Sequence, residues 1–180
     1  MGGADEGLRT VLKFGGSCLK NSADISAIAD RIRMFNPSPV VVVSAFFGVT
    51  DRLLDAINDA RSHSFDRVSF LRWVRDHHCA LAPEILTSTS LPRFEEALSN
   101  LDVALASLED GDGAEVPVLV SGERLSSVCL EAALSSRGIK VRAMWAEEVP
   151  IRVKGRAPFV RMDLSRTSEC ARIPSDEIPL

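Results

Sequence analysis

Four consecutive valines, Val40 to Val43, constrain the fold of this chain more than any other stretch. The turn-forming residues 36–39 precede the run and Ser44 follows it, so it has the length of a short strand and no polar face. A strand without a polar face is typical of a parallel sheet covered by helices on both sides. We therefore expect Val40–Val43 to be a central strand, buried on both faces and paired on both edges.

A second short apolar run, residues 10–14, is interrupted by Lys13 and stops at Gly15-Gly16. Two glycines let the backbone turn sharply and direct its N–H groups at an anion. Asn21 or Ser22 can then cap a helix, whose first amides add partial positive charge to that of Lys13. Strand, glycine turn and helix in this order suit a phosphate. An ordinary tight connection is the alternative interpretation.

The remaining pattern alternates between strands and helices. Apolar spacing predicts helices over residues 22–35, 51–60 and 64–82, and a further helix from Leu91 to a loop at residues 111–113. Residues 116–120 have strand-like composition and run into a helix through Leu134. Residues 141–145 are predicted to be another strand. Such alternation predicts an α/β fold with three layers and a mostly parallel central sheet. We expect residues 1–8 to be a loose leader and residues 9–150 to form one lobe. Residues 151–180 read as a weakly patterned tail, too broken by prolines to supply several strands.

Composition narrows the function classes. A formal charge of −4 gives no reason to expect a nucleic acid or a membrane as partner. No apolar run approaches a membrane span, and residues 1–10 lack the order of a signal peptide. The four cysteines are scattered, which indicates reduced thiols and a cytoplasmic location. Adjacent helical residues point apart, so His77-His78-Cys79 is not expected to bind a metal.

Three ordered segments resemble a known family. They are K-F-G-G-S at residues 13–17, V-V-V-S-A-F-F-G-V-T-D-R-L at residues 41–53 and S-G-E-R-L-S at residues 121–126. Together they resemble the N-terminal, substrate-side part of aspartate kinases, within the amino-acid kinase family. V-R-A-M-W-A-E-E-V and K-G-R-A also look like segments that follow in that family. The resemblance is loose over residues 62–110 and faint after residue 150. The sequence has no G-x-x-x-x-G-K-[ST], the motif of P-loop kinases.

The resemblance implies a site for L-aspartate and for ATP with Mg²⁺. The positions that match the family's site are Lys13, as the catalytic and phosphate-facing lysine, Gly15, Gly16 and Ser17 around the phosphate, and Ser44, Thr50 and Glu123 around the amino acid. Cys18 stands where aspartate kinases usually have serine, and Arg124 matches no fixed position.

The implied chemistry is transfer of the γ-phosphate of ATP to the side-chain carboxylate of aspartate. A carboxylate is ionised at neutral pH, so no general base is needed, and the difficulty is to bring two anions together. Two of the residues have purely structural interpretations. Ser44 could cap the following helix. Glu123 and Ser126 could belong to a helix start, where an acid stabilises the first turn.

In the family, the nucleotide is held mainly by a second half that follows a strand near Ile178. No second glycine-rich turn follows Gly16, so we expect the fold to be incomplete on its C-terminal side and inactive alone. One hypothesis is a catalytic lobe completed by a separate ATP-side lobe. The other is a non-catalytic relic or interaction module that keeps the fold. A kinase for another amino acid, such as glutamate, is a third. An unpaired sheet edge predicts a homo-oligomer or binding of the separate lobe.

Overall fold

The N-terminal strand and the valine strand lie side by side in the computed structural model, which describes residues 10–62, 65–111, 114–149, 151–156, 159–170 and 177–180. Strand β1 (Val11–Phe14) pairs in parallel with β2 (Val40–Val43), with Val11 opposite Val40. Helix α1 (Ser22–Arg33) connects them. It starts as predicted, because the Asn21 side chain accepts hydrogen bonds from two amides of the first turn.

A second parallel pair consists of β3 (Val141–Arg142) and β6 (Ile178–Pro179). Strand β6 also lies against β2, which places the four strands in the spatial order β1, β2, β6, β3. This arrangement confirms the predicted α/β class with parallel strands.

Strand β2 differs from its prediction. Within the described residues it is hydrogen-bonded only to β1, because the strands form three separate two-stranded sheets. Val41 is buried, but Val42 is 42% exposed. The expectation of a strand buried on both faces is therefore wrong. One face packs on the core, and residues 40–43 also border a surface cavity described below.

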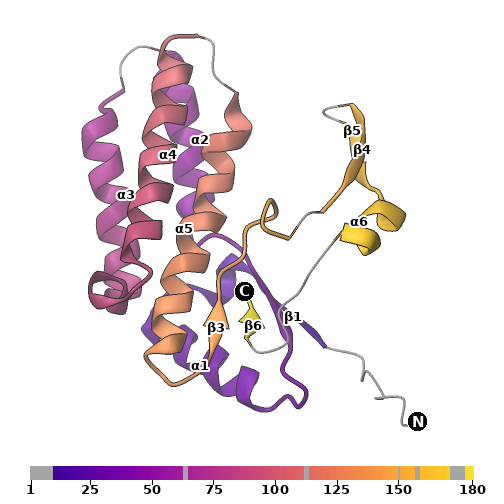
Figure 1. Ribbon diagram of the computed structural model, residues 1–180. Helices are drawn as coiled ribbons and strands as arrows, with labels where there is room; N and C mark the ends of the chain where they lie inside the picture. The colour runs from indigo at the N-terminus through magenta and orange to yellow at the C-terminus, as the bar shows by residue number, and fades with distance from the viewer. Residues whose placement is uncertain (1–9, 63–64, 112–113, 150, 157–158, 171–176) are drawn as a thin grey trace.

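Four helices form a layer of their own (Figure 1). They are α2 (Val49–Arg61), α3 (Arg67–Leu81), α4 (Leu91–Glu109) and α5 (Glu115–Ser135), with the 3₁₀ turn η2 (Pro83–Thr87) between α3 and α4. The main core lies among them, and its largest fully buried side chains include Phe46, Phe94, Leu101, Leu125 and Leu130. Pro92 lies in the first turn of α4, as expected for a helix that begins at Leu91. Among the described residues, no helix is long and apolar enough to cross a membrane.

The strand-like segment at residues 116–120 is part of helix α5 in the structure. Its valines suggest a strand, yet Pro117 is the third residue of α5, where its missing N–H breaks no helical hydrogen bond. Val118 is buried against the core, while Val116 and Val120 face solvent. Tertiary packing on α4 outweighs the strand propensity of β-branched residues here.

The tail contains more regular structure than predicted. Strands β4 (Val153–Arg156) and β5 (Phe159–Met162) form an antiparallel pair, α6 (Leu164–Cys170) follows, and β6 closes the described chain. The expectation that residues 151–180 are too broken for several strands is therefore wrong. A hairpin pairs with itself and needs no long apolar pattern. It stands apart from the helical layer in Figure 1. The leader at residues 1–8 and the predicted loop residues 112–113 lie outside the described residues.

Candidate functional site

Lys13 and Ser44 meet at the carboxyl ends of β1 and β2. The Lys13 Nζ donates a hydrogen bond to Ser44 Oγ over 2.6 Å and another to the Phe14 carbonyl oxygen over 3.2 Å. The Ser44 N–H donates to the same carbonyl over 3.1 Å. The interpretation of Ser44 as a helix cap is wrong, because α2 is preceded by Gly48, whose φ of 80° suits glycine.

The predicted glycine turn is a short 3₁₀ helix, η1 (Gly16–Cys18), closed by hydrogen bonds from Cys18 N–H to Gly15 O and from Leu19 N–H to Gly16 O. Neither glycine has a positive φ, so the turn does not depend on the freedom that we expected. Gly16 is needed for space instead, since a Cβ there would lie 3.2 Å from the Ala45 carbonyl oxygen. Gly15 has open space at its Cβ position, and Ser17 beside it is exposed.

The loop after β2, residues 44–48, is contacted by two further segments. Its Phe47 N–H donates to the carbonyl oxygen of Leu19, just after η1, over 3.1 Å. Its Phe46 N–H donates to Ser126 Oγ of α5 over 2.8 Å. Helix α5 approaches closely because residue 122 is glycine. A Cβ on Gly122 would lie 3.0 Å from Ala45 Cβ. The glycine turn at Gly15-Gly16, the loop and α5 therefore meet at Ala45.

Glu123 and Thr50 are adjacent to this junction without bonding to it. Glu123 follows Gly122 on α5 and lines a cavity together with Val43, and Thr50 is the second residue of α2. Both are exposed, and within the described chain neither side chain makes a hydrogen bond or an ion pair. Since α5 begins at Glu115, the interpretation of Glu123 and Ser126 as a helix start is wrong.

The cavity beside Glu123 has a volume of about 520 Å³. Its walls are mainly apolar side chains from β2, α5, β6 and residues 144–147, together with Val149 and Ile151. The charged side chains among the described lining residues are Glu123, Arg124 and Glu147. Glu123, a candidate for the amino-acid site, therefore lies in the wall of a mostly apolar cavity.

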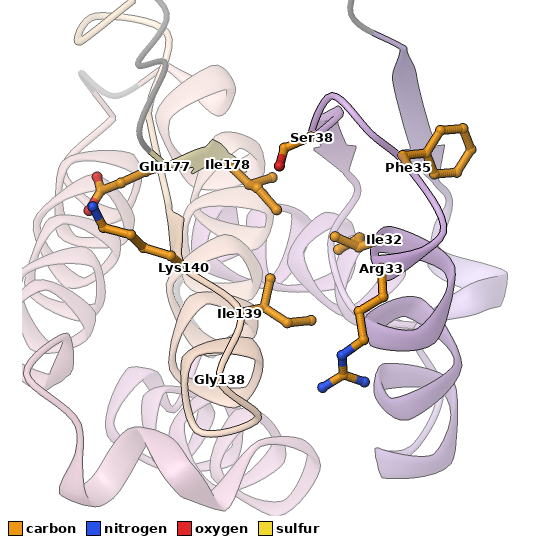
Figure 2. A pocket seen from close by; sticks show the side chains of 9 residues that line it. All are labelled: Ile32, Arg33, Phe35, Ser38, Gly138, Ile139, Lys140, Glu177 and Ile178. Atoms are coloured by element: carbon orange, nitrogen blue, oxygen red, sulfur yellow. The ribbon is translucent and has the colours of Figure 1, made fainter.

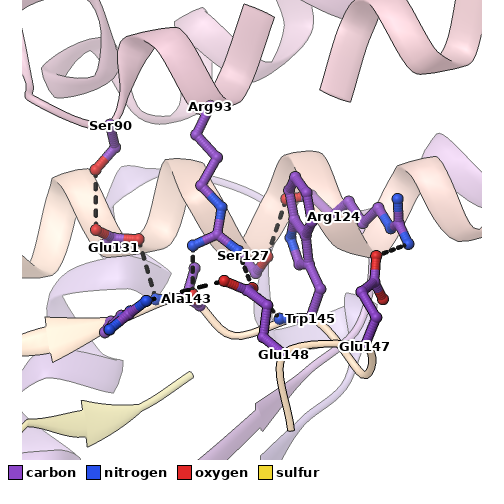
Figure 3. A network of polar contacts seen from close by, with 10 residues as sticks. Ser90, Arg93, Arg124, Ser127, Glu131, Ala143, Trp145, Glu147 and Glu148 are labelled. Atoms are coloured by element: carbon purple, nitrogen blue, oxygen red, sulfur yellow. Dashed lines mark hydrogen bonds and ion pairs between the residues drawn. The ribbon is translucent and has the colours of Figure 1, made fainter. Parts of the chain in front are cut away.

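A polar network fixes the far wall of this cavity on α4 and α5 (Figure 3). The Trp145 ring lies between two guanidinium groups. Its centroid is 4.2 Å from Arg93 Cζ and 4.8 Å from Arg124 Cζ. Arg93 also pairs with Glu148, and Arg124 pairs with Glu147. Flat guanidinium groups stack well on indole rings. Arg124, for which the sequence indicated no role, thus holds residues 145–148 next to Glu123.

Three residues that sequence reasoning missed support the loop: Gly122, Ser126 and His78. Gly122 and Ser126 lie four residues apart, so a helix places them on one face, and this spacing was a usable signal. His78 is fully buried and stacks on Phe46 with ring centroids 5.2 Å apart. Burial lowers the pKa of His78 to about 4. No local pattern in the sequence indicated this contact. Among the described residues no group of three His, Cys, Asp or Glu side chains is arranged to hold a metal ion.

A second cavity, of about 350 Å³, lies at the opposite ends of the strands (Figure 2). It is lined by residues that precede β2, β3 and β6, including Ser38, Lys140 and Glu177, and by the end of α1. In open α/β sheets, ligands bind outside the carboxyl ends of the strands. That rule favours the Lys13–Ser44 end as the functional site.

Comparison with known proteins identifies the family of the chain. The sequence model described as the amino acid kinase family matches residues 8–175. The chain is 33% identical over 150 residues to a bifunctional aspartokinase/homoserine dehydrogenase 1 of Zea mays, covering 78% of this chain and 16% of that protein. It is also 33% identical over 131 residues to an aspartokinase of Chlamydia pneumoniae, covering 72% of this chain and 28% of that protein. The chain thus spans well under a third of these relatives.

Solved structures show the same fold. The structure of E. coli aspartokinase III in complex with aspartate and ADP superimposes with a TM-score of 0.75 at 19% identity, covering 91% of this chain and 36% of that one. The aspartate kinase of Clostridium acetobutylicum gives 0.65 at 18% identity, over 90% and 35% of the two chains. By its family match, its relatives and its fold, the chain belongs to the amino acid kinase family and is similar to aspartokinases.

Proposed function

We propose that this chain forms the aspartate-binding part of an aspartokinase site, which converts ATP and L-aspartate to ADP and 4-phospho-L-aspartate. The observation that carries the proposal is the contact between Lys13 Nζ and Ser44 Oγ. This contact joins Lys13, which we assign to the transferred phosphate, to Ser44, which we assign to the amino acid. Both lie at the carboxyl ends of parallel strands, where α/β folds bind ligands.

Each assigned residue has a role that suits its chemistry. The Lys13 ammonium group offsets the repulsion between the aspartate side chain and the phosphate, as the catalytic residue. The Ser44 and Thr50 hydroxyls donate to the α-carboxylate of aspartate, and Glu123 pairs with its α-ammonium group. Glu123 has no protein partner within the described chain, so it is available for this pairing.

The described residues fit a phosphate group of ATP, although they offer no site for the nucleoside that we can identify. Lys13 supplies positive charge, Gly15 leaves space beside the strand end, and Ser17 supplies an exposed hydroxyl. Residues Gly15, Gly16 and Ser17 would therefore face the phosphate. We assign no residue of this chain to Mg²⁺, because no cluster of suitable ligands lies among the described residues.

We further propose that residues 9–150 act as the substrate-side lobe of a cytoplasmic enzyme, and that residues 151–180 begin the ATP-side lobe. Activity then requires the ATP-side lobe, on a separate chain or on further sequence, and the isolated chain makes no detectable aspartyl phosphate. Val42 at the exposed face of β2 and Val11 on the outer strand β1 favour association with that lobe or with a second copy. Light scattering after size-exclusion chromatography measures the association.

Binding of L-aspartate to the isolated chain tests the proposal directly. A few polar contacts to a small ligand should give a Kd in the millimolar range, roughly 1 mM or weaker. Backbone NMR signals of Gly15 and Gly16 should shift on titration, and Glu123→Ala should abolish the shifts. Glu96→Ala is the matched control, since Glu96 is an exposed glutamate on α4.

Shifts that persist in Glu123→Ala would contradict the assigned pocket. Absence of any binding by the folded wild-type chain would favour the alternative, an interaction module that keeps the kinase fold. A hydroxamate assay with MgATP completes the test. Turnover by the isolated chain above that of Lys13→Ala would refute the incomplete site.

A further inference from the structure

A chain of hydrogen bonds connects the loop after β2 to α5 and α3 inside the core. The Phe46 N–H donates to Ser126 Oγ over 2.8 Å, and Ser126 Oγ lies 3.5 Å from His78 Nε2. His78 Nδ1 lies 2.8 Å from the Val74 carbonyl oxygen, one turn earlier in α3. Ser126 and His78 are both fully buried, so water does not compete for these bonds.

The donors and acceptors in this series of hydrogen bonds follow from its last group, the Val74 carbonyl oxygen. The Val74 carbonyl oxygen can only accept, so Nδ1 carries the proton of the neutral imidazole and Nε2 is an acceptor. The Ser126 hydroxyl therefore donates to His78 and accepts from the Phe46 N–H. Burial lowers the pKa of His78 to about 4, which keeps the ring neutral and this direction intact at neutral pH.

His78 holds Phe46 in a second way. The two rings stack at 5.2 Å with an angle of 25° between their planes. The side chain of Phe46 is therefore held by His78 directly, and its backbone is held through Ser126. Phe46 lies two residues after Ser44, whose hydroxyl accepts the hydrogen bond from Lys13.

We propose that Ser126 and His78 are positioning residues for the aspartate pocket, which fix the backbone of Phe46 and thereby hold the Ser44 hydroxyl opposite Lys13. The inference rests on the proposed function and adds two residues that touch no substrate. Without Ser126 Oγ the buried Phe46 N–H has no acceptor, and the loop must shift to find one.

The test uses two variants and a matched control. Ser126→Ala removes the acceptor, and His78→Phe keeps a stacking ring but removes both nitrogens. Ser121→Ala is the control, because Ser121 is a second buried serine of α5 whose hydroxyl donates to the Pro117 carbonyl oxygen of the same helix over 2.8 Å. Three quantities are measured for each: the Kd for L-aspartate by NMR titration, the exchange rate of the Phe46 amide hydrogen, and the thermal midpoint.

Ser126→Ala and His78→Phe should each raise the Kd about tenfold, equivalent to about 1.4 kcal/mol, and should speed exchange of the Phe46 amide. Ser121→Ala should leave both unchanged at a similar thermal midpoint. Equal Kd changes in Ser126→Ala and Ser121→Ala would mean general destabilisation and would overturn the inference. Wild-type affinity in both variants would overturn it while leaving the proposed function standing. A wild-type chain that binds no aspartate would remove the proposed function and this inference with it. If Ser126→Ala does not fold, His78→Phe decides alone.

Discussion

The loop at residues 44–48 and the β4–β5 hairpin are both short segments outside the long helices, yet they are held in different ways. The loop is contacted by the chain after η1, by α5 and by α3, and its Phe46 is fully buried. The hairpin pairs with itself and leaves Val153, Val160 and Met162 exposed. A site that must hold substrate groups within fractions of an ångström needs the first kind of support. Of the candidate residues, Ser44 belongs to this loop and Lys13 is hydrogen-bonded to it.

The largest expected difference between the two regions is in stability. Phe94 is fully buried and packs near His78, so Phe94→Ala should lower the free energy of unfolding by about 3–5 kcal/mol. Val160 is 50% exposed in the hairpin, and Val160→Ala should change it by less than about 0.5 kcal/mol. Urea unfolding followed by circular dichroism measures both. Comparable losses would show that the hairpin is as firmly packed as the helical layer.

The pH dependence of stability tests the buried histidine that supports the loop. His78 has a pKa of about 4 in the folded protein and an ordinary value of 6.5, because burial disfavours its charged form. Since the folded pKa is the lower one, the unfolded chain binds the proton first as the pH falls. The contribution of the neutral, buried His78 to the free energy of unfolding is complete above pH 6.5 and is lost as the pH falls from 6.5 to 4. The loss amounts to about 3 kcal/mol at about 1.4 kcal/mol per pKa unit.

His78→Phe should remove that part of the pH dependence. His78 is surrounded by uncharged residues, namely Phe46, Val74, Phe94 and Ser126. The titratable neighbour is His77, whose own pKa is lowered by burial and whose protonated form lowers the pKa of His78 further. Unfolding curves for both proteins at several pH values give the comparison. Parallel pH profiles for the two would contradict a buried neutral His78.

The smallest expected difference lies between two neighbouring glycines. Gly16→Ala brings a Cβ to 3.2 Å from the Ala45 carbonyl oxygen, so it should destabilise the protein by about 1 kcal/mol. Gly15 has open space and an ordinary φ of −80°, so Gly15→Ala should be neutral or stabilise by about 0.5 kcal/mol. Thermal unfolding distinguishes them. The reverse order would show that η1 does not pack against the loop as described.

The parts of the fold that were predictable from sequence are those with local causes. The start of α1 follows from the Asn21 cap, and the start of α4 follows from Leu91-Pro92. Where tertiary context decides, prediction failed. Residues 116–120 are helical because Val118 packs on the core, and Val42 is exposed although its run has no polar face.

The residues of the candidate site also differ in whether the sequence alone could indicate them. Lys13 and Ser44 were indicated by family resemblance, and the structure brings them into contact. The roles of Lys13 and Ser44 remain predictions, as do those of Thr50 and Glu123, and among the described residues no hydrogen bond or ion pair connects the last two to Lys13. Ser126 lies 80 positions from Phe46 along the sequence, and His78 lies 48 positions from Ser126. No periodic pattern reports contacts at such separations.

A crystal structure of the chain grown with L-aspartate tests the central claim most directly, namely that the Lys13–Ser44 contact marks the substrate-binding end of the strands. We predict the side-chain carboxylate of aspartate within hydrogen-bond distance of Lys13 Nζ, its α-carboxylate at Ser44 and its α-ammonium group at Glu123. Aspartate bound instead among residues that precede β2, β3 and β6, with Lys13 and Ser44 still bonded to each other, would contradict the account.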